Sequence, residues 1–493
     1  MERRASGLRK SMKLSDVFMY NSLTISFFSM MWFLLYAFQP VAFPEGSILF
    51  GTLSMLAVSI PFFYSYYTLS REMPLAGGDY VFQSRLINPG VGFVTTFTGW
   101  VLWQFFFLAW FGYYIVDVVL IPTIYYLNVS PYLIEVISSP YSVFGLTVAL
   151  FVLAFGIVVK GLDLYVKAQK ALFALMVLGG FSAILIAFSH VRYAVTIGFP
   201  TSYRSLWETV GTWSLGWGAL GYGMWSVMNN EEIMEVRSRK YFIAMSAAAV
   251  LNVMFVIALW EGLKASLGYE YISRISKDWY SGNMSGIYSY VGGPYYTAMM
   301  IFLRPNPILF LLLSVGAIAS MFQVIIAIMI GASRVVLSQA LDGILPSSLS
   351  VVSDRSRSPV PAAVFGLVLS LIWLYLIVFV PAIGPYFVSV VFATQMTWIF
   401  TMLAGVILGV KRRSNRIIGA SAAGLLLNSF IAYLYIAYPQ LGFTSGISAE
   451  VVAGVTGAAA LYYVLRDMWA KKKRGFYFEE AIRIMEETEV IRE

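Results

Sequence analysis

Long apolar runs follow one another along almost the whole chain, separated by short segments that hold most of the charges, prolines and glycines. A helix needs roughly 20 mostly apolar residues to cross the hydrocarbon core of a bilayer, so the pattern predicts an all-α membrane protein with about 12 transmembrane helices. The predicted spans are 17–43, 47–69, 92–127, 142–159, 168–190, 209–230, 241–262, 307–333, 360–380, 385–409, 417–438 and 447–465. The uncharged segment 279–303 is rich in Gly, Ser and Tyr and is predicted to lie outside the membrane.

Composition agrees with this class of protein. Hydrophobic residues make up 59% of the chain and charged residues only 12%, whereas about a quarter of the residues of a soluble domain are charged. Lipid is therefore the expected surrounding medium.

The distribution of the basic residues predicts the orientation. The net charge is +8, but most Lys and Arg residues fall in alternate loops and in the two terminal segments, as the positive-inside bias predicts for cytoplasmic loops. We therefore expect a multi-pass protein of the cell membrane with both termini in the cytoplasm, and no nucleic-acid partner. The basic residues assigned to the opposite face are Arg192, Arg204, Lys264, Arg274, Lys277 and Arg304.

Motifs for catalysis, ATP hydrolysis and metal binding are missing from the sequence. It has no cysteine and a single histidine, His190, which the pattern places at the outer end of its span. It contains no Walker loop, HExxH or GxSxG motif. We expect no cofactor, no metal site and no enzymatic activity, so that any work is driven by a gradient.

The order of the spans suggests an internal duplication. Transporters often contain two repeats of opposite membrane orientation. Twelve spans divide into a first five-helix repeat at 17–190, a second at 209–409 and two extra helices at 417–465. A cytoplasmic segment, 1–16, would precede them and a cytoplasmic tail, 466–493, would follow.

Two spans have the composition of discontinuous helices. The sixth reads TWSLGWGALGYGMWSVMNNEE, and each glycine costs about 1 kcal/mol of helix propensity. These glycines indicate either unwound backbone or close helix packing of the GxxxG kind. The first span, YNSLTISFFSMMWF, has no glycine, and its hydroxyls could bond to their own helix.

Three stretches resemble the amino acid–polyamine–organocation (APC) superfamily of transporters. Residues 71–93, REMPLAGGDYVFQSRLINPGVGF, are similar to the internal loop of that family, with its Pro-x-x-Gly-Gly-x-Tyr core. Residues 331–363 resemble its exit from helix eight, with a Ser-Arg pair, Asp-Gly, Leu-Pro and Pro-Val-Pro. The third stretch is the Gly-rich helix six, which runs into Glu231, Glu232 and a basic turn at 237–240.

The resemblance implies an inverted five-helix repeat, with an amino acid or a related small amine bound where helices one and six are broken. The glycines of residues 218–225 leave room for a substrate side chain, and Tyr222 and Trp225 offer apolar surface, so we expect a neutral or aromatic substrate rather than an acidic one. The family's Gly-x-Gly in helix one is replaced here by residues 25–29, ISFFS. The implied breaks lie near 25–29 and 218–225. The implied substrate-binding residues are Ile25, Ser26, Phe27, Phe28, Ser29, Gly218, Ala219, Gly221, Tyr222, Gly223 and Trp225.

The coupling ion stays open between Na⁺ and H⁺. Some family members carry a lysine in the middle of helix five, and this chain has none between Ala171 and Ala187. A sodium site would use carbonyls of helix one and hydroxyls such as those of Ser26 and Ser320, although the sequence favours a helix-packing role for Ser320.

Two other classes of protein are alternatives to a secondary transporter. A membrane-embedded enzyme would need clustered acidic residues at one interface. Glu231, Glu232 and Glu235 form such a cluster, but we expect them to pair with the basic residues at 237–240. A channel would need a pore lined by repeated polar residues rather than one Gly-rich span.

Overall fold

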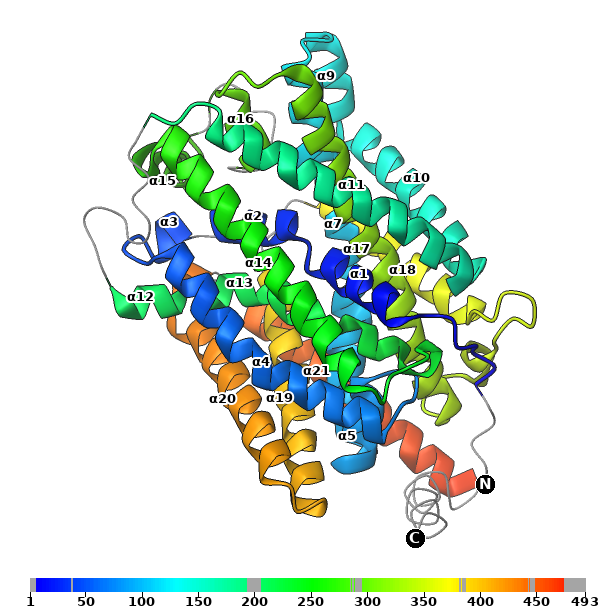
Figure 1. Cartoon of the computed structure of the whole chain (residues 1–493). Helices are drawn as coiled ribbons and strands as arrows, with labels where there is room; N and C mark the ends of the chain where they lie inside the picture. The colour runs from blue at the N-terminus through cyan, green and yellow to red at the C-terminus, as the bar shows by residue number, and fades with distance from the viewer. Residues whose placement is uncertain are drawn as a thin grey trace.

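The computed structural model describes residues 6–36, 39–192, 205–283, 285, 288, 295–380, 383, 387–441, 443 and 448–473. Within these ranges the chain is helical apart from its connections and one isolated bridge between Met12 and Ile233. The long helices run side by side in a bundle (Figure 1). The predicted tail beyond residue 473 and Arg204 lie outside the described residues.

Ten helices or runs of helix in the described part are long and apolar enough to cross a membrane. Each coincides with one of the predicted spans, which confirms the all-α membrane fold. They are α4 (Ile48–Glu72), the run α6–α8 (Pro89–Tyr126), α10 (Pro140–Val159), α11 (Leu162–Phe188), α14 (Arg239–Leu267), α17 (Pro307–Leu341), α18 (Val360–Phe379), α19 (Phe387–Lys411), α20 (Asn415–Ala437) and α21 (Ser448–Lys473).

The remaining two predicted spans, 17–43 and 209–230, are divided among shorter pieces. The first contains α1 (Leu14–Ile25), α2 (Phe27–Tyr36) and α3 (Gln39–Ala42). The second contains α12 (Leu206–Gly211), α13 (Trp213–Leu220) and the 3-10 helix η3 (Gly221–Glu232). The total of about 12 spans and the division into repeats stay predictions.

The starts of several long helices are encoded by capping residues. The Ser47 hydroxyl accepts a hydrogen bond from the backbone N–H of Phe50 at the start of α4. Asn88 before α6 and Asn306 before α17 accept from the backbone N–H of the second residue of their helices, at 2.8 and 2.9 Å, and proline is the first residue of both. These side chains satisfy N–H groups that have no acceptor within the helix.

Short helices occupy the connections between the long ones. They are α5 (Asp79–Leu86), α9 (Pro131–Ser138), α15 (Tyr269–Tyr280), α16 (Tyr296–Ile301) and two single-turn 3-10 helices at Ser347–Ser350 and Pro439–Leu441. Helix α5 lies in the predicted internal loop. Helix α16 lies in the predicted external segment, part of which is outside the described residues.

Helix α17 is central to the packing. It contacts α11 along much of its length and also packs against α1, α7 (Trp103–Tyr114) and α18. Most of the apolar part of the run α6–α8 is buried, whereas only a small part of that of α21 is buried. The centre of the bundle is therefore formed by α1, α2, η3, α7 and α17.

The two described ends of the chain meet the same end of α17. Met12 bridges to Ile233, next to Glu232, which binds Arg334 of α17. Arg466 of α21 donates to the carbonyl of Gly343, two residues after α17 ends, at 2.9 Å. The ends thus lie on one face of the bundle.

Candidate functional site

The first predicted span is interrupted at Ser26, within the interval 25–29. Helix α1 ends at Ile25 and α2 begins at Phe27, while Ser26 between them has φ 50° and ψ 99°. A positive φ is unfavourable for a residue with a Cβ atom, by roughly 1–2 kcal/mol. The chain changes direction here without a glycine.

The hydroxyl of Ser26 explains how the interruption is held. It accepts hydrogen bonds from the backbone N–H of Ser29 at 3.1 Å and from the Ser29 hydroxyl at 2.9 Å. The N–H of Met30 donates to the Ser26 carbonyl at 2.9 Å. Ser26 is therefore the N-cap of α2. Its hydroxyl also lies 2.6 Å from that of Ser320 on α17, so the two candidate ion ligands are in contact.

The interruption leaves backbone groups without partners inside their own helices. The first N–H groups of a helix have no intrahelical acceptor, and the last carbonyls have no intrahelical donor. At this position they are the N–H groups of Phe27 and Phe28 and the carbonyls of Leu23, Thr24 and Ile25. The rings of Phe27 and Phe28 stack on Phe255 and Tyr296, at centroid distances of 4.5 and 5.6 Å.

Helix six differs from the prediction. Its backbone does not unwind between Gly218 and Trp225, but changes from α-helix to 3-10 helix at Gly221. The first non-helical dihedral angles come at Asn229, with φ −106° and ψ 20°. The 3-10 turn is tighter and its hydrogen bonds are poorer, which makes this segment easier to rearrange than an α-helix.

Close packing accounts for most of the glycines in helix six. A Cβ atom on Gly221 would lie 2.3 Å from the Trp398 ring, and one on Gly223 would lie 2.9 Å from Phe63 and 3.1 Å from Ile25. At Gly218 the nearest atom would be 3.8 Å away, an ordinary contact. The packing alternative thus holds at Gly221 and Gly223. The neighbouring Ala219 is also buried, with 3% of its surface exposed.

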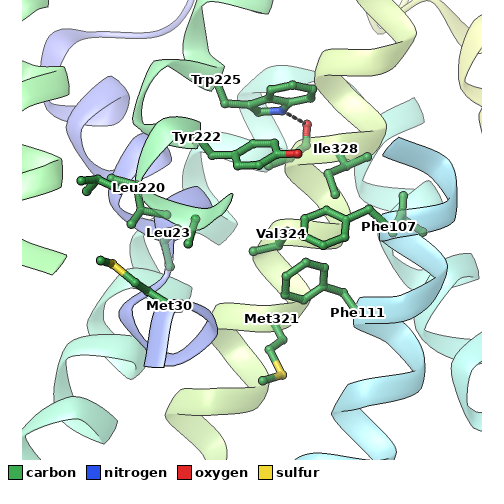
Figure 2. Packing of buried hydrophobic residues seen from close by; sticks show 14 of the residues in the cluster. Leu23, Met30, Phe107, Phe111, Leu220, Tyr222, Trp225, Met321, Val324 and Ile328 are labelled. Atoms are coloured by element: carbon green, nitrogen blue, oxygen red, sulfur yellow. Dashed lines mark hydrogen bonds between the residues drawn. The ribbon is translucent and has the colours of Figure 1, made fainter. Parts of the chain in front are cut away.

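Tyr222 and Trp225 project from η3 toward α7 and α17 (Figure 2). The Tyr222 hydroxyl accepts from the Gln104 side chain at 2.6 Å, and the Tyr222 ring stacks on Phe107. The indole N–H of Trp225 donates to the Ala327 carbonyl at 2.9 Å. Two of the predicted aromatic residues are therefore fixed by neighbouring helices.

Other residues of this centre were not predicted from the sequence. Figure 2 shows Phe107 and Phe111 of α7 facing Met321 and Val324 of α17, below Tyr222. The spans that carry them are apolar on every side, so periodicity does not single out these positions. Only the folded structure shows that α7 lies beside α17.

A buried ion pair joins the end of η3 to the C-terminal part of α17. The Arg334 guanidinium binds both oxygens of Glu232, at 2.9 and 3.0 Å, and each side chain is 1% exposed. The expected pairing of Glu232 with the basic turn at 237–240 is wrong, because α17 continues to Leu341 and carries Arg334 to Glu232. The N–H groups of Ser11 and Met12 donate to the Glu232 carbonyl.

The predicted site is closed in this conformation. Ile25, Ser26, Ser29 and Trp225 are at most 2% exposed and Tyr222 is 5% exposed. A molecule that binds among them must enter through a conformational change.

The long apolar helices and the interrupted first helix define a multi-pass membrane protein of the transporter class. The chain belongs to the amino acid permease family, whose family model matches residues 18–455, and this confirms the resemblance to the APC superfamily. No curated protein matches the chain. The family and the helices support a transporter of amino acids rather than an enzyme.

Proposed function

We propose that this protein is a secondary active transporter that moves amino acids or related small amines across the cell membrane by alternating access. The observation that carries the proposal is the interruption at Ser26, in the middle of a buried span. Non-helical backbone at membrane depth is tolerated where it is buried in protein or lines a cavity, and in transporters it binds the substrate.

The backbone around Ser26 offers complementary groups for an amino acid. The N-terminus of α2 presents the N–H groups of Phe27 and Phe28, with the positive end of the helix dipole, to a carboxylate. The carbonyls at the end of α1 can accept from an ammonium group. The substrate side chain would then face the rings of Tyr222 and Phe107, which favour a neutral or aromatic side chain over an acidic one.

The Ser26–Ser320 contact is the proposed ion site if sodium drives the cycle. A hard cation needs several oxygen ligands. Two hydroxyls meet here, and the freed carbonyls of α1 lie next to Ser26 in the chain. The cation would have to replace the hydrogen bond between the two serines.

Purified protein in liposomes tests the proposal. We expect saturable counterflow, in which unlabelled amino acid inside the vesicles accelerates entry of labelled amino acid, with neutral and aromatic amino acids competing best. A channel would give flux without counterflow, and an enzyme would give a chemically altered product. Absence of counterflow with every amino acid would refute the function, and equal uptake in sodium and choline would refute the ion site.

A further inference from the structure

Asp79 is a fully buried carboxyl group, with 0% of its surface exposed, at the first position of α5. It lies outside the predicted spans, in the loop between α4 and the run α6–α8. A buried carboxylate usually has a cation partner, since its desolvation is costly. Asp79 has no cation within salt-bridge distance among the described residues.

Three neutral side chains from three helical segments donate to Asp79. The Tyr66 hydroxyl of α4 donates to Oδ1 at 2.6 Å, and the Thr401 hydroxyl of α19 donates to the same oxygen. The indole N–H of Trp100, in the π-helical segment Phe97–Leu102, donates to Oδ2 at 2.8 Å. The carboxyl group thus ties α5 to α4, to the segment Phe97–Leu102 and to α19.

The charged groups nearby are engaged elsewhere. Arg85 of α5 binds Asp342 at 2.8 Å, and Arg334 of α17 binds Glu232 at 2.9 Å. Among the segments that pack on α5, neither α6 (Pro89–Thr96) nor the segment Phe97–Leu102 carries a titratable residue. Helix α19 carries only Lys411, at its far end. From α4, Tyr66 is the titratable group in contact with Asp79.

The donor set fits a proton better than a metal cation. An indole N–H can only donate, so it cannot ligate a cation, and among the described residues no second carboxylate is bonded to Asp79. A proton can be placed on Oδ1, because the hydroxyls of Tyr66 and Thr401 can turn from donors into acceptors. Burial raises the pKa of Asp79 to about 6, against the opposing effect of the three donors.

We propose that Asp79 is a proton-binding site that couples proton movement to the transport cycle. This inference rests on the proposed function and names H⁺ as a coupling ion. Ionised Asp79 accepts from all three donors and holds α5 in place. Protonation reverses at least one hydroxyl and loosens α5 from α4 or α19.

The surrounding contacts connect this site to the aromatic centre and to a second helix. The Trp100 ring lies 4.9 Å from that of Trp225, centroid to centroid. Thr401 also accepts from the Gln83 amide at 2.9 Å, and that amide reaches the Thr397 carbonyl at the same distance. A change at Asp79 therefore reaches both the candidate substrate site and the α5–α19 contact.

An infrared measurement tests proton binding without transport. The difference spectrum of the purified protein between about pH 8 and about pH 5 should contain the C=O band of a protonated carboxyl group that titrates well above a free Asp. Asp79→Asn should remove that band, and Asp79→Glu should shift its frequency. No such band in the wild type, or the same band in both variants, would overturn the inference.

A vesicle measurement tests coupling. In sodium-free liposomes that contain a pH-sensitive dye, substrate addition should acidify the interior of wild-type vesicles. Asp79→Asn mimics the protonated state and should lose acidification while keeping counterflow above that of empty liposomes. Asp163→Asn, an exposed acid at the start of α11, is the matched control and should acidify like the wild type.

The outcomes separate the two proposals. Wild-type counterflow without proton movement refutes coupling but leaves the transport function standing, and acidification by Asp79→Asn at the wild-type rate refutes the role of this residue. No counterflow at all refutes the transport function, while the infrared band still decides whether Asp79 binds a proton. Asp79→Glu keeps a titrating group and should keep acidification at a reduced rate. This variant serves as the folding control, so that a loss of both counterflow and acidification in Asp79→Asn through misfolding can be recognised.

Discussion

At the scale of single residues, Ser26 combines two opposing effects. Its positive φ is unfavourable, and its hydroxyl compensates by capping α2 and contacting Ser320. A cap of this kind is worth about 1 kcal/mol, which is similar to the cost of the backbone conformation. Alanine and glycine at this position separate the two effects.

We expect Ser26→Gly to retain more transport and more thermal stability than Ser26→Ala. Both variants lose the cap and the Ser320 contact, but glycine adopts the positive φ freely, so the difference in stability should be about 1 kcal/mol in favour of glycine. Thermal unfolding of the purified variants and uptake kinetics measure it. Ser26→Ala should weaken the binding of all substrates alike, because the backbone groups next to Ser26 bind the part that every amino acid shares. Equal stability of the two variants would show that the hinge is not under strain.

The sequence located the interruption in helix one only through the resemblance to a family. The residues 22–29 contain several hydroxyls, and nothing in their spacing distinguishes a capping serine from one bonded to its own helix. In helix six the difficulty was the reverse, because conspicuous glycines do not mark unwound backbone there. Their low helix propensity was compatible with both unwinding and close packing, and only the resemblance to the family favoured a break. In the structure the rings of Trp398 and Phe63 fill the space beside Gly221 and Gly223 and account for these two glycines.

At the scale of elements, the loop that carries α5 contains two consecutive glycines with positive φ. Gly77 has φ 96° and Gly78 has φ 44°. The N–H of Gly77 donates to the Met228 carbonyl at 3.0 Å, and a Cβ atom on Gly78 would lie 2.8 Å from the sulfur of Met228. The loop therefore packs directly against the end of helix six.

Gly78→Val should impair transport while leaving membrane insertion intact. Valine at this φ costs at least about 1–2 kcal/mol, and its side chain would also push against Val227 and Met228. Gly282→Val is the matched control, because Gly282 has φ 75° with open space beside it. We expect the uptake rate to fall strongly for the first variant and little for the second. Full uptake by Gly78→Val would argue against a tight fit between loop and helix six.

The existence of the long helices was predictable, because the length of an apolar run decides whether it can cross a membrane as a helix. The ten long helices coincide with predicted spans. Their ends were less predictable. Helix α17 continues past the predicted limit, since the polar residues from Ser333 to Gln339 are buried against neighbouring helices instead of reaching water. That continuation brings Arg334 to Glu232, a contact that charge patterning within one loop did not reveal.

At the scale of the whole molecule, the two described chain ends lie on one face, which agrees with the predicted even number of spans. The excess of basic residues predicts that this face is cytoplasmic. The membrane itself and the relation between the two predicted five-helix repeats have no counterpart in local sequence pattern, so an experiment has to establish the orientation.

Single cysteines introduced into this cysteine-free chain test the orientation. Cysteines at Ser11 and Ser414 should be shielded from an impermeant thiol reagent in intact cells and should react after permeabilisation. One at Ser281, which is exposed on the opposite predicted face, should react in intact cells. Labelling of the Ser414 variant from outside would reverse the topology and the assignment of the repeats with it.

The serine at the hinge of helix one also affects how relatives of this protein can be recognised. A search pattern that demands paired glycines in the first span would pass over this chain, although its helix is interrupted all the same. A pattern that also admits serine, followed three residues later by a second hydroxyl, would retain it. Genomes screened with the broader pattern should yield additional permeases in which hydroxyl side chains, rather than glycines, hold the interruption of the first helix.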